Sequence, residues 1–195
     1  MPIGIEKRPV YLNVDKSGHL VMRDAARNIQ AFDFIEGELT DCRVVAVDGH
    51  YGASEKLQLD FSDDDGTLYR VSMGYRTGHA RSIVLALAGV ERFGRVKLSV
   101  WKKDDDGYIR ASVRNDGELL RWAHPLPPAG VDEAGEKDTT TRDEFIDELL
   151  RQIQARLPGQ VSTPAVPSSL ADAIRIRREQ ALPVTPVIDD DDVPF

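Results

Sequence analysis

The chain has 195 residues, of which 41% are hydrophobic and 30% are charged, and its formal net charge is −8. This length allows one globular domain with a tail or two small domains, and the composition excludes fibrous and collagen-like proteins. The longest apolar stretch, residues 83–90, is too short to span a bilayer, and the first residues lack a secretory pattern. We therefore expect a cytoplasmic protein without membrane contact, in which the single Cys42 forms no disulfide and no zinc site.

The excess of acidic side chains lies in the last third of the chain. Residues 125–195 hold 14 acidic and 7 basic side chains, a net charge of −7, whereas residues 1–124 have a net charge of only −1. The acidic total therefore does not exclude a nucleic acid as the ligand of the first part.

Residues 36–114 show the alternation of polar and apolar side chains that is typical of strands. We expect three strands, then a helix between Thr77 and Gly89, then two more strands, over residues 39–47, 56–62, 67–75, 77–89, 95–103 and 108–114. This order is that of a five-stranded OB-fold barrel, which has one helix between strands 3 and 4. The fold class is therefore predicted to be mainly β.

The segments around this barrel complete the predicted organisation. An N-terminal extension, residues 1–35, packs on the barrel domain, residues 36–124, and contains a hairpin near Lys16 to Gly18. Trp122, at the domain edge, is expected to pack against this extension. Dense prolines then begin a linker over residues 125–140.

The C-terminal part begins with an amphipathic helix over residues 141–157, with Thr141 and Glu144 as a capping box. Its apolar stripe needs a partner surface, which is the barrel, a second copy of the chain in a homo-oligomer, or another protein. Residues 158–188 form a Pro-rich linker with a weak helix. Residues 189–195 are an acidic tip that we expect to be disordered when nothing is bound.

The outward side chains of the last two predicted strands are basic, aromatic or small. A four-residue turn at 104–107 places Trp101 opposite Arg110. Single-stranded nucleic acid needs such a surface, because cations hold its phosphates and exposed rings stack on its bases. The alternative is a solvated face whose arginines pair with the nearby Asp runs. The predicted DNA-binding residues are Arg95, Lys97, Trp101, Lys103, Tyr108, Arg110 and Arg114, with Tyr75 and Arg76 at a neighbouring strand end.

No pattern of catalytic or metal-binding residues is found in the sequence. The two Asp-Asp-Asp-Gly runs, at 63–66 and 104–107, do not fit a calcium loop and are interpreted as hairpin turns. The four histidines lack ligand spacing, and no nucleophile motif occurs. We therefore expect neither cofactor nor metal, and a non-enzymatic protein; a nuclease that uses the Asp runs is the least favoured hypothesis.

The last seven residues combine charge with an apolar end. Four carboxylates attract a basic surface at long range, while the final ring and carboxylate fit one arginine-lined apolar pocket. A tail that only confers solubility has no need for this apolar ending. The predicted partner-binding residues are Asp189, Asp190, Asp191, Asp192, Val193, Pro194 and Phe195.

This ending resembles the acidic tip of bacterial and phage single-stranded-DNA-binding proteins, which consist of an OB domain, a Pro-rich linker and a tip of Asp residues followed by an apolar residue, Pro and Phe. The resemblance implies that residues 189–195 recruit replication, recombination and repair proteins. The barrel of this chain begins near residue 36, and its linker contains a helix, so a divergent, phage-type member fits best.

The leading hypothesis is sequence-independent binding of single-stranded DNA, which protects the strand, with partner recruitment through the tip. The alternative is a protein-binding adaptor or transcription regulator that holds polymerase or repair proteins through the helix at 141–157 and the acidic tail. Stacking and phosphate contacts would also serve RNA.

Overall fold

A computed structural model describes residues 8–24, 26–49, 52–103, 106–131 and 137–158. This part of the chain is mainly β. Its elements, in chain order, are β1 Val10–Val14, β2 Leu20–Arg23, β3 Ile29–Phe32, β4 Phe34–Gly49, β5 Gly52–Ser62, β6 Leu68–Gly74, α1 Gly78–Leu87, β7 Arg95–Lys102, β8 Ile109–Asn115, β9 Glu118–Leu119, β10 Gly130–Val131, β11 Lys137–Asp138 and α2 Thr140–Arg156.

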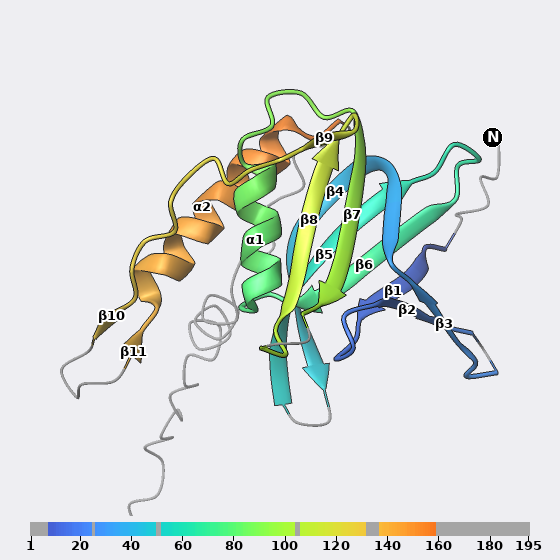
Figure 1. The fold of residues 1–195 in the computed structure, drawn as a ribbon, viewed down its shortest axis with the longest axis horizontal. Coiled ribbons are helices and arrows are strands. Elements are labelled where there is room, and N and C mark those ends of the chain that lie inside the picture. The colour runs from blue at the N-terminus through green and yellow to red at the C-terminus, as the bar shows by residue number, and fades with distance from the viewer. Residues whose placement is uncertain (1–7, 25, 50–51, 104–105, 132–136, 159–195) are drawn as a thin grey trace, which may run out of the picture.

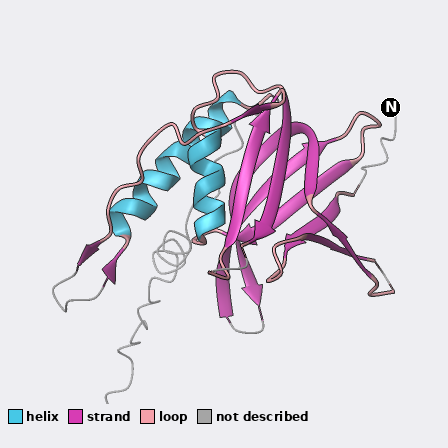
Figure 2. Cartoon of the chain, in the orientation of Figure 1, coloured by secondary structure: helices cyan, strands magenta, loops and turns pink. Residues whose placement is uncertain are grey.

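One curled, open sheet forms the body of the molecule, like half of a barrel (Figure 1). Its nine strands run in the order β3-β2-β1-β6-β5-β4-β7-β8-β9, and β10 pairs only with β11. The two helices lie on the side of β8, and the three N-terminal strands form the opposite side (Figure 2). The order predicted for residues 36–114, three strands, a helix and two strands, is confirmed.

Strand β4 is long, bends at a bulge and pairs with two other strands. It pairs with β5 along most of its length and with β7 through residues 34–38, and the register shifts between Leu39 and Asp41. A bulge strengthens the local twist of a strand, which curls the sheet. β4 begins at Phe34, two residues before the predicted start of the barrel domain.

The N-terminal strands, predicted as an extension packed on the barrel, belong to the same sheet. β1 pairs with β6 in parallel, with Val10 beside Tyr69, so β1, β2 and β3 continue the same sheet. The predicted hairpin itself is confirmed, since β1 pairs with β2 in antiparallel register. Its turn is built by Asp15, whose carboxylate accepts from the backbone N–H groups of Ser17 and His19, each at 3.0 Å.

Helix α1 begins where the sequence places it. The Thr77 side chain accepts a hydrogen bond from the N–H of Ala80, and the helix ends with Ala88 as its C-cap, one residue before Gly89. Its apolar residues, including Ile83 and Val84, are buried against the sheet. The helix therefore packs against the sheet beside β8 (Figure 1).

Helix α2 packs with its apolar stripe against the sheet and α1. Of the three predicted partner surfaces for this stripe, the structure shows the first, the chain's own sheet domain. Four of its side chains are buried, those of Ile146, Leu149, Leu150 and Ile153. The predicted capping box is wrong, because α2 begins at Thr140, and Thr139 makes no side-chain cap. Instead, the Thr139 hydroxyl donates to the Asp143 carboxylate at 2.9 Å.

The core lies between the sheet and the two helices. Alternating residues of β5 and β7 point into it, as the period of two predicts, and none of the described polar or charged residues is buried. Cys42 is fully buried there, and burial raises the pKa of its thiol far above the usual value. A buried thiol with a raised pKa is a weak nucleophile.

Candidate nucleic-acid interface

The predicted face on β7 and β8 is present, and its register is the predicted one. Val96, Leu98 and Val100 point into the core, so the residues between them point outward. Trp101 stands directly opposite Arg110, and Lys97 opposite Arg114. The backbone N–H of Lys103 donates to the carbonyl of Tyr108 at 3.2 Å, which closes the hairpin.

A further aromatic ring joins this face from β4. Phe34 pairs with Ser99 in the neighbouring strand, and 49% of its surface is exposed. The Nζ atom of Lys97 lies 3.6 Å from the centre of its ring, a cation–π contact. The sequence prediction assigned Phe34 to the extension and missed its place on this face. Phe34 lies two residues before Glu36, which pairs with Lys97, and residues two apart in a strand point to the same side of the sheet.

Exposed rings continue to the end of the hairpin. Trp101 is 44% exposed and Tyr108 is 69% exposed. Between the rows of Trp101 and Lys97 the outward residues are the small Ser99 and Ser112, which face each other. Rings and cations therefore stand on either side of a row of small hydroxyl side chains.

Several cations of this face already have acidic neighbours. Arg95 pairs with Asp64, with Asp63 at 3.6 Å and with Glu36 at 3.3 Å, and Arg110 pairs with Asp106. The two Asp runs thus supply part of the counter-charge, as the solvated-face alternative requires. These pairs are exposed, and such pairs contribute only about 0–1 kcal/mol, so a polyanion can replace them.

The two residues predicted at the end of β6 do not belong to this face. Tyr75 is only 4% exposed, and its hydroxyl donates to Asp147 of α2. Burial and the neighbouring Asp147 raise the pKa of Tyr75 above its usual range. Arg76 pairs with Glu55 at 3.2 Å and with Asp143 at 3.0 Å. Both residues hold α2 against the sheet.

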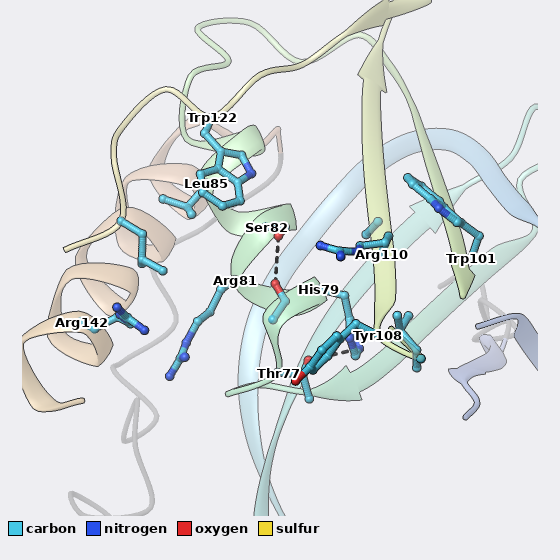
Figure 3. Close-up of a pocket in the computed structure, with 15 residues that line it drawn as sticks. Thr77, His79, Arg81, Ser82, Leu85, Trp101, Tyr108, Arg110, Trp122 and Arg142 are labelled. Atoms are coloured by element: carbon cyan, nitrogen blue, oxygen red, sulfur yellow. Dashed lines mark hydrogen bonds between the residues drawn. The ribbon is translucent and has the colours of Figure 1, made fainter. Parts of the chain in front are cut away.

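A pocket of about 720 Å³ opens at the edge of this face, between β8 and the helices (Figure 3). Trp101, Tyr108 and Arg110 line it from the strands. His79, Arg81 and Arg142 line it from α1 and α2, and Trp122 from the segment after β9. The expectation that Trp122 packs on the N-terminal extension is wrong, because its ring stands beside Leu85 of α1 and is 54% exposed.

A second hollow, of about 660 Å³, lies on the other side of Trp101. It is lined by the turn between β1 and β2 and by the end of β7, through Lys16, Ser17, His19, Asp33, Val100, Trp101 and Lys102. His19 Nδ1 lies 3.2 Å from the carboxylate of Asp33. Trp101 therefore lines both concave regions.

Other features of the described residues bear on chemistry. No group of His, Cys, Asp or Glu there has the arrangement of a metal site. Burial lowers the pKa of His79, which favours its neutral form.

The first Asp run forms a turn, as predicted, with the N–H of Gly66 donating to the carbonyl of Asp63 at 2.9 Å. Within the described ranges, no helix is both long and apolar enough to cross a membrane.

The predicted partner-binding tip, residues 189–195, lies outside the described residues. Comparisons of the chain with protein-family models, with curated proteins and with solved structures found no match.

Proposed function

We propose that the protein binds single-stranded DNA without reading its sequence. The observation that carries this proposal is the set of exposed rings, Phe34, Trp101 and Tyr108, placed among cations on one side of the sheet. Each exposed ring offers a base a stacking surface of about 1–3 kcal/mol, and the cations face the phosphates. Duplex DNA hides its bases inside the helix and cannot use these rings.

The proposed fold is an OB-fold barrel extended by the N-terminal strands. The strand order β6-β5-β4-β7-β8, with α1 between β6 and β7, supports it. OB-folds bind single strands across a face of this kind and protect them from other enzymes. In this proposal the protein is not an enzyme, and the tip at residues 189–195 recruits replication, recombination or repair proteins.

The adaptor alternative has less support. It relied on a free apolar face of the helix at 141–157, but this face is buried against the protein's own sheet and α1. Only the acidic tip is left to hold a partner in that hypothesis. The DNA-binding hypothesis accounts for the exposed rings, which the adaptor hypothesis leaves without a role.

The test is replacement of Trp101 and Arg110 together by Ala. We expect affinity for oligo-dT to fall by about tenfold or more, because one stacking ring and one cation are lost. The matched control is Tyr11→Ala together with Arg23→Ala. These substitutions remove an exposed ring on β1 and an exposed arginine on β2. Unchanged affinity in a folded Trp101/Arg110 double variant would refute the assignment of this face.

A further inference from the structure

The pocket between β8 and the helices gathers aromatic rings from three segments. Trp101 stands near the end of β7, Tyr108 precedes β8, and Trp122 follows β9 (Figure 3). Large rings are mostly buried in folded proteins, yet these three are 44%, 69% and 54% exposed. Exposed rings that line one pocket indicate a ligand with flat surfaces on which they can stack.

The same pocket holds three arginines from three elements, and none of the described carboxylates lines it. Arg81 pairs with Asp143 at 2.6 Å, and Arg110 pairs with Asp106. Arg142 donates its Nε to the carbonyl of Pro127 at 2.9 Å, and it forms no ion pair with a carboxylate in the described ranges. Its outer guanidinium nitrogens are therefore well suited to receive a phosphate.

Arg142 is held in place because α2 is anchored at its far end as well as along its stripe. Gln154 Nε2 donates to the carbonyl of Cys42 at 2.8 Å, and Arg156 Nη1 donates to the carbonyl of Val90 at 2.6 Å. The Arg81–Asp143 pair adds a link between α1 and α2 beside the pocket. A side chain that is fixed before binding loses less conformational entropy when a ligand arrives.

We infer that this pocket is a nucleotide subsite at the end of the DNA path. The strand crosses the outer face of β7 and β8, passes Trp101, and places an unstacked nucleotide between β8 and α2. Its base stacks on Trp122, and its phosphate pairs with Arg142. A volume of about 720 Å³ lies within the usual range of roughly 300–1,000 Å³ for ligand pockets. This inference rests on the proposed function and extends the DNA site to helix α2, which lies outside the predicted DNA-binding residues.

The first test compares Arg142→Gln with Arg151→Gln in the full-length protein. Both residues lie on α2 and lose the same charge, but Arg151 is 65% exposed, pairs with Glu148 and does not line the pocket. Oligo-dT affinity should fall about tenfold more for Arg142→Gln, and the slope of log affinity against log salt should become shallower by about 0.7. Equal affinities and slopes for the two variants would overturn the subsite.

The second test locates the base. An oligo-dT that carries a photoreactive 5-iodouracil is irradiated in complex with the protein, and the modified residues are identified by mass spectrometry. Adducts on Trp122 support the subsite, and adducts on Trp101 without any on Trp122, at every position of the label, overturn it while the proposed function stands. If the wild-type protein binds no oligo-dT, the proposed function fails, and the subsite fails with it.

Discussion

The carboxylate of Asp60 is held by arginines from the two neighbouring strands. Arg70 donates from Nη2 and Nε at 2.6 and 2.7 Å, and Arg43 donates from Nη1 at 3.1 Å. Burial acts to raise the pKa of Asp60, but the hydrogen bonds and charges of the two arginines outweigh burial and hold the pKa below its usual value. The ionised form of Asp60 therefore stabilises the folded state.

Replacing Asp60 by Asn should lower the free energy of unfolding at neutral pH by about 1–3 kcal/mol, because the arginines lose their shared carboxylate. The stabilisation is complete above the pKa of Asp in the unfolded chain, about 4, and is lost as the pH falls through the lower folded pKa. Urea unfolding at neutral pH and at several pH values below about 4 measures this change.

The matched control for Asp60→Asn is Asp48→Asn, which removes the same charge from an exposed position of β4. The difference between the two variants should shrink as the pH falls. A difference that stays constant down to acid pH would show that the Asp60 pKa is not lowered by folding.

The position of a site residue was predictable where the alternation of side chains along a strand and the length of one turn determine which residues face each other. The turn at 104–107 and the alternation of β7 and β8 were enough to place Trp101 opposite Arg110. The positions of Trp122 and Arg142 were not predictable in this way. Arg142 lines the pocket because α2 folds back onto the sheet, and Trp122 lines it because the segment after β9 returns beside α1, where the N–H of Ala123 donates to the carbonyl of Leu85. Local periodicity does not encode such tertiary contacts.

The hairpin of β1 and β2 contacts the end of β7 closely at a glycine. Gly18 has φ +83°, and a Cβ atom added there would lie 2.4 Å from the backbone N of Lys102 and 2.6 Å from the carbonyl carbon of Trp101. These distances are too short for any side chain, and the obstacles are backbone atoms. The hairpin therefore closes the second hollow beside Trp101 only while residue 18 is glycine.

Gly18→Ala should destabilise the protein more than Gly117→Ala, its matched control. Gly117 also has φ +83°, but a Cβ atom there would meet nothing within 4 Å. The control should cost about 1 kcal/mol for the left-handed backbone alone, and Gly18→Ala about 1–3 kcal/mol more. Urea unfolding measures both values, and the tryptophan emission of the folded protein should change only in Gly18→Ala, because residue 18 contacts Trp101. Equal losses of stability would show that the close approach does not matter.

Most elements were predictable because each carries its own period, capping residue or turn. The Thr77 cap of α1 and the stripe of α2 are local patterns of this kind. The parallel pairing of β1 with β6 was not predictable, since it joins residues about sixty positions apart and parallel strands share no turn. The start of β4 at Phe34 was missed for a related reason, because only its pairing with β7 shows that it belongs to the sheet.

The distribution of charge along the chain predicts competition between the acidic tip and DNA. Residues 189–192 are four aspartates, whereas the face on β7 and β8 presents cations whose present partners are exposed carboxylates. The four aspartates of the acidic tip should therefore bind to this face when no DNA is present. Such an interaction is electrostatic and weakens as salt shortens the screening length, which is about 10 Å at 0.1 M and about 3 Å at 1 M.

Deletion of residues 189–195 should therefore tighten oligo-dT binding at low salt, and the gain should fade as the salt concentration rises. Replacing Asp189, Asp190, Asp191 and Asp192 by Asn, with Val193 to Phe195 kept, separates the charge from the apolar end. Both variants should show the same gain. A tip whose removal changes nothing at any salt concentration would act only as a hook for partner proteins.

Binding of single strands through stacking and cations on this sheet surface is the property on which the proposed function depends. A fluorescence titration with oligo-dT and with a duplex of equal length, at two salt concentrations, tests it most directly, because the chain's two tryptophans, Trp101 and Trp122, both line the pocket. We expect a salt-sensitive preference for the single strand, with quenching of the tryptophan emission. No binding at low salt, or equal affinity for the duplex without quenching, would refute the proposed function.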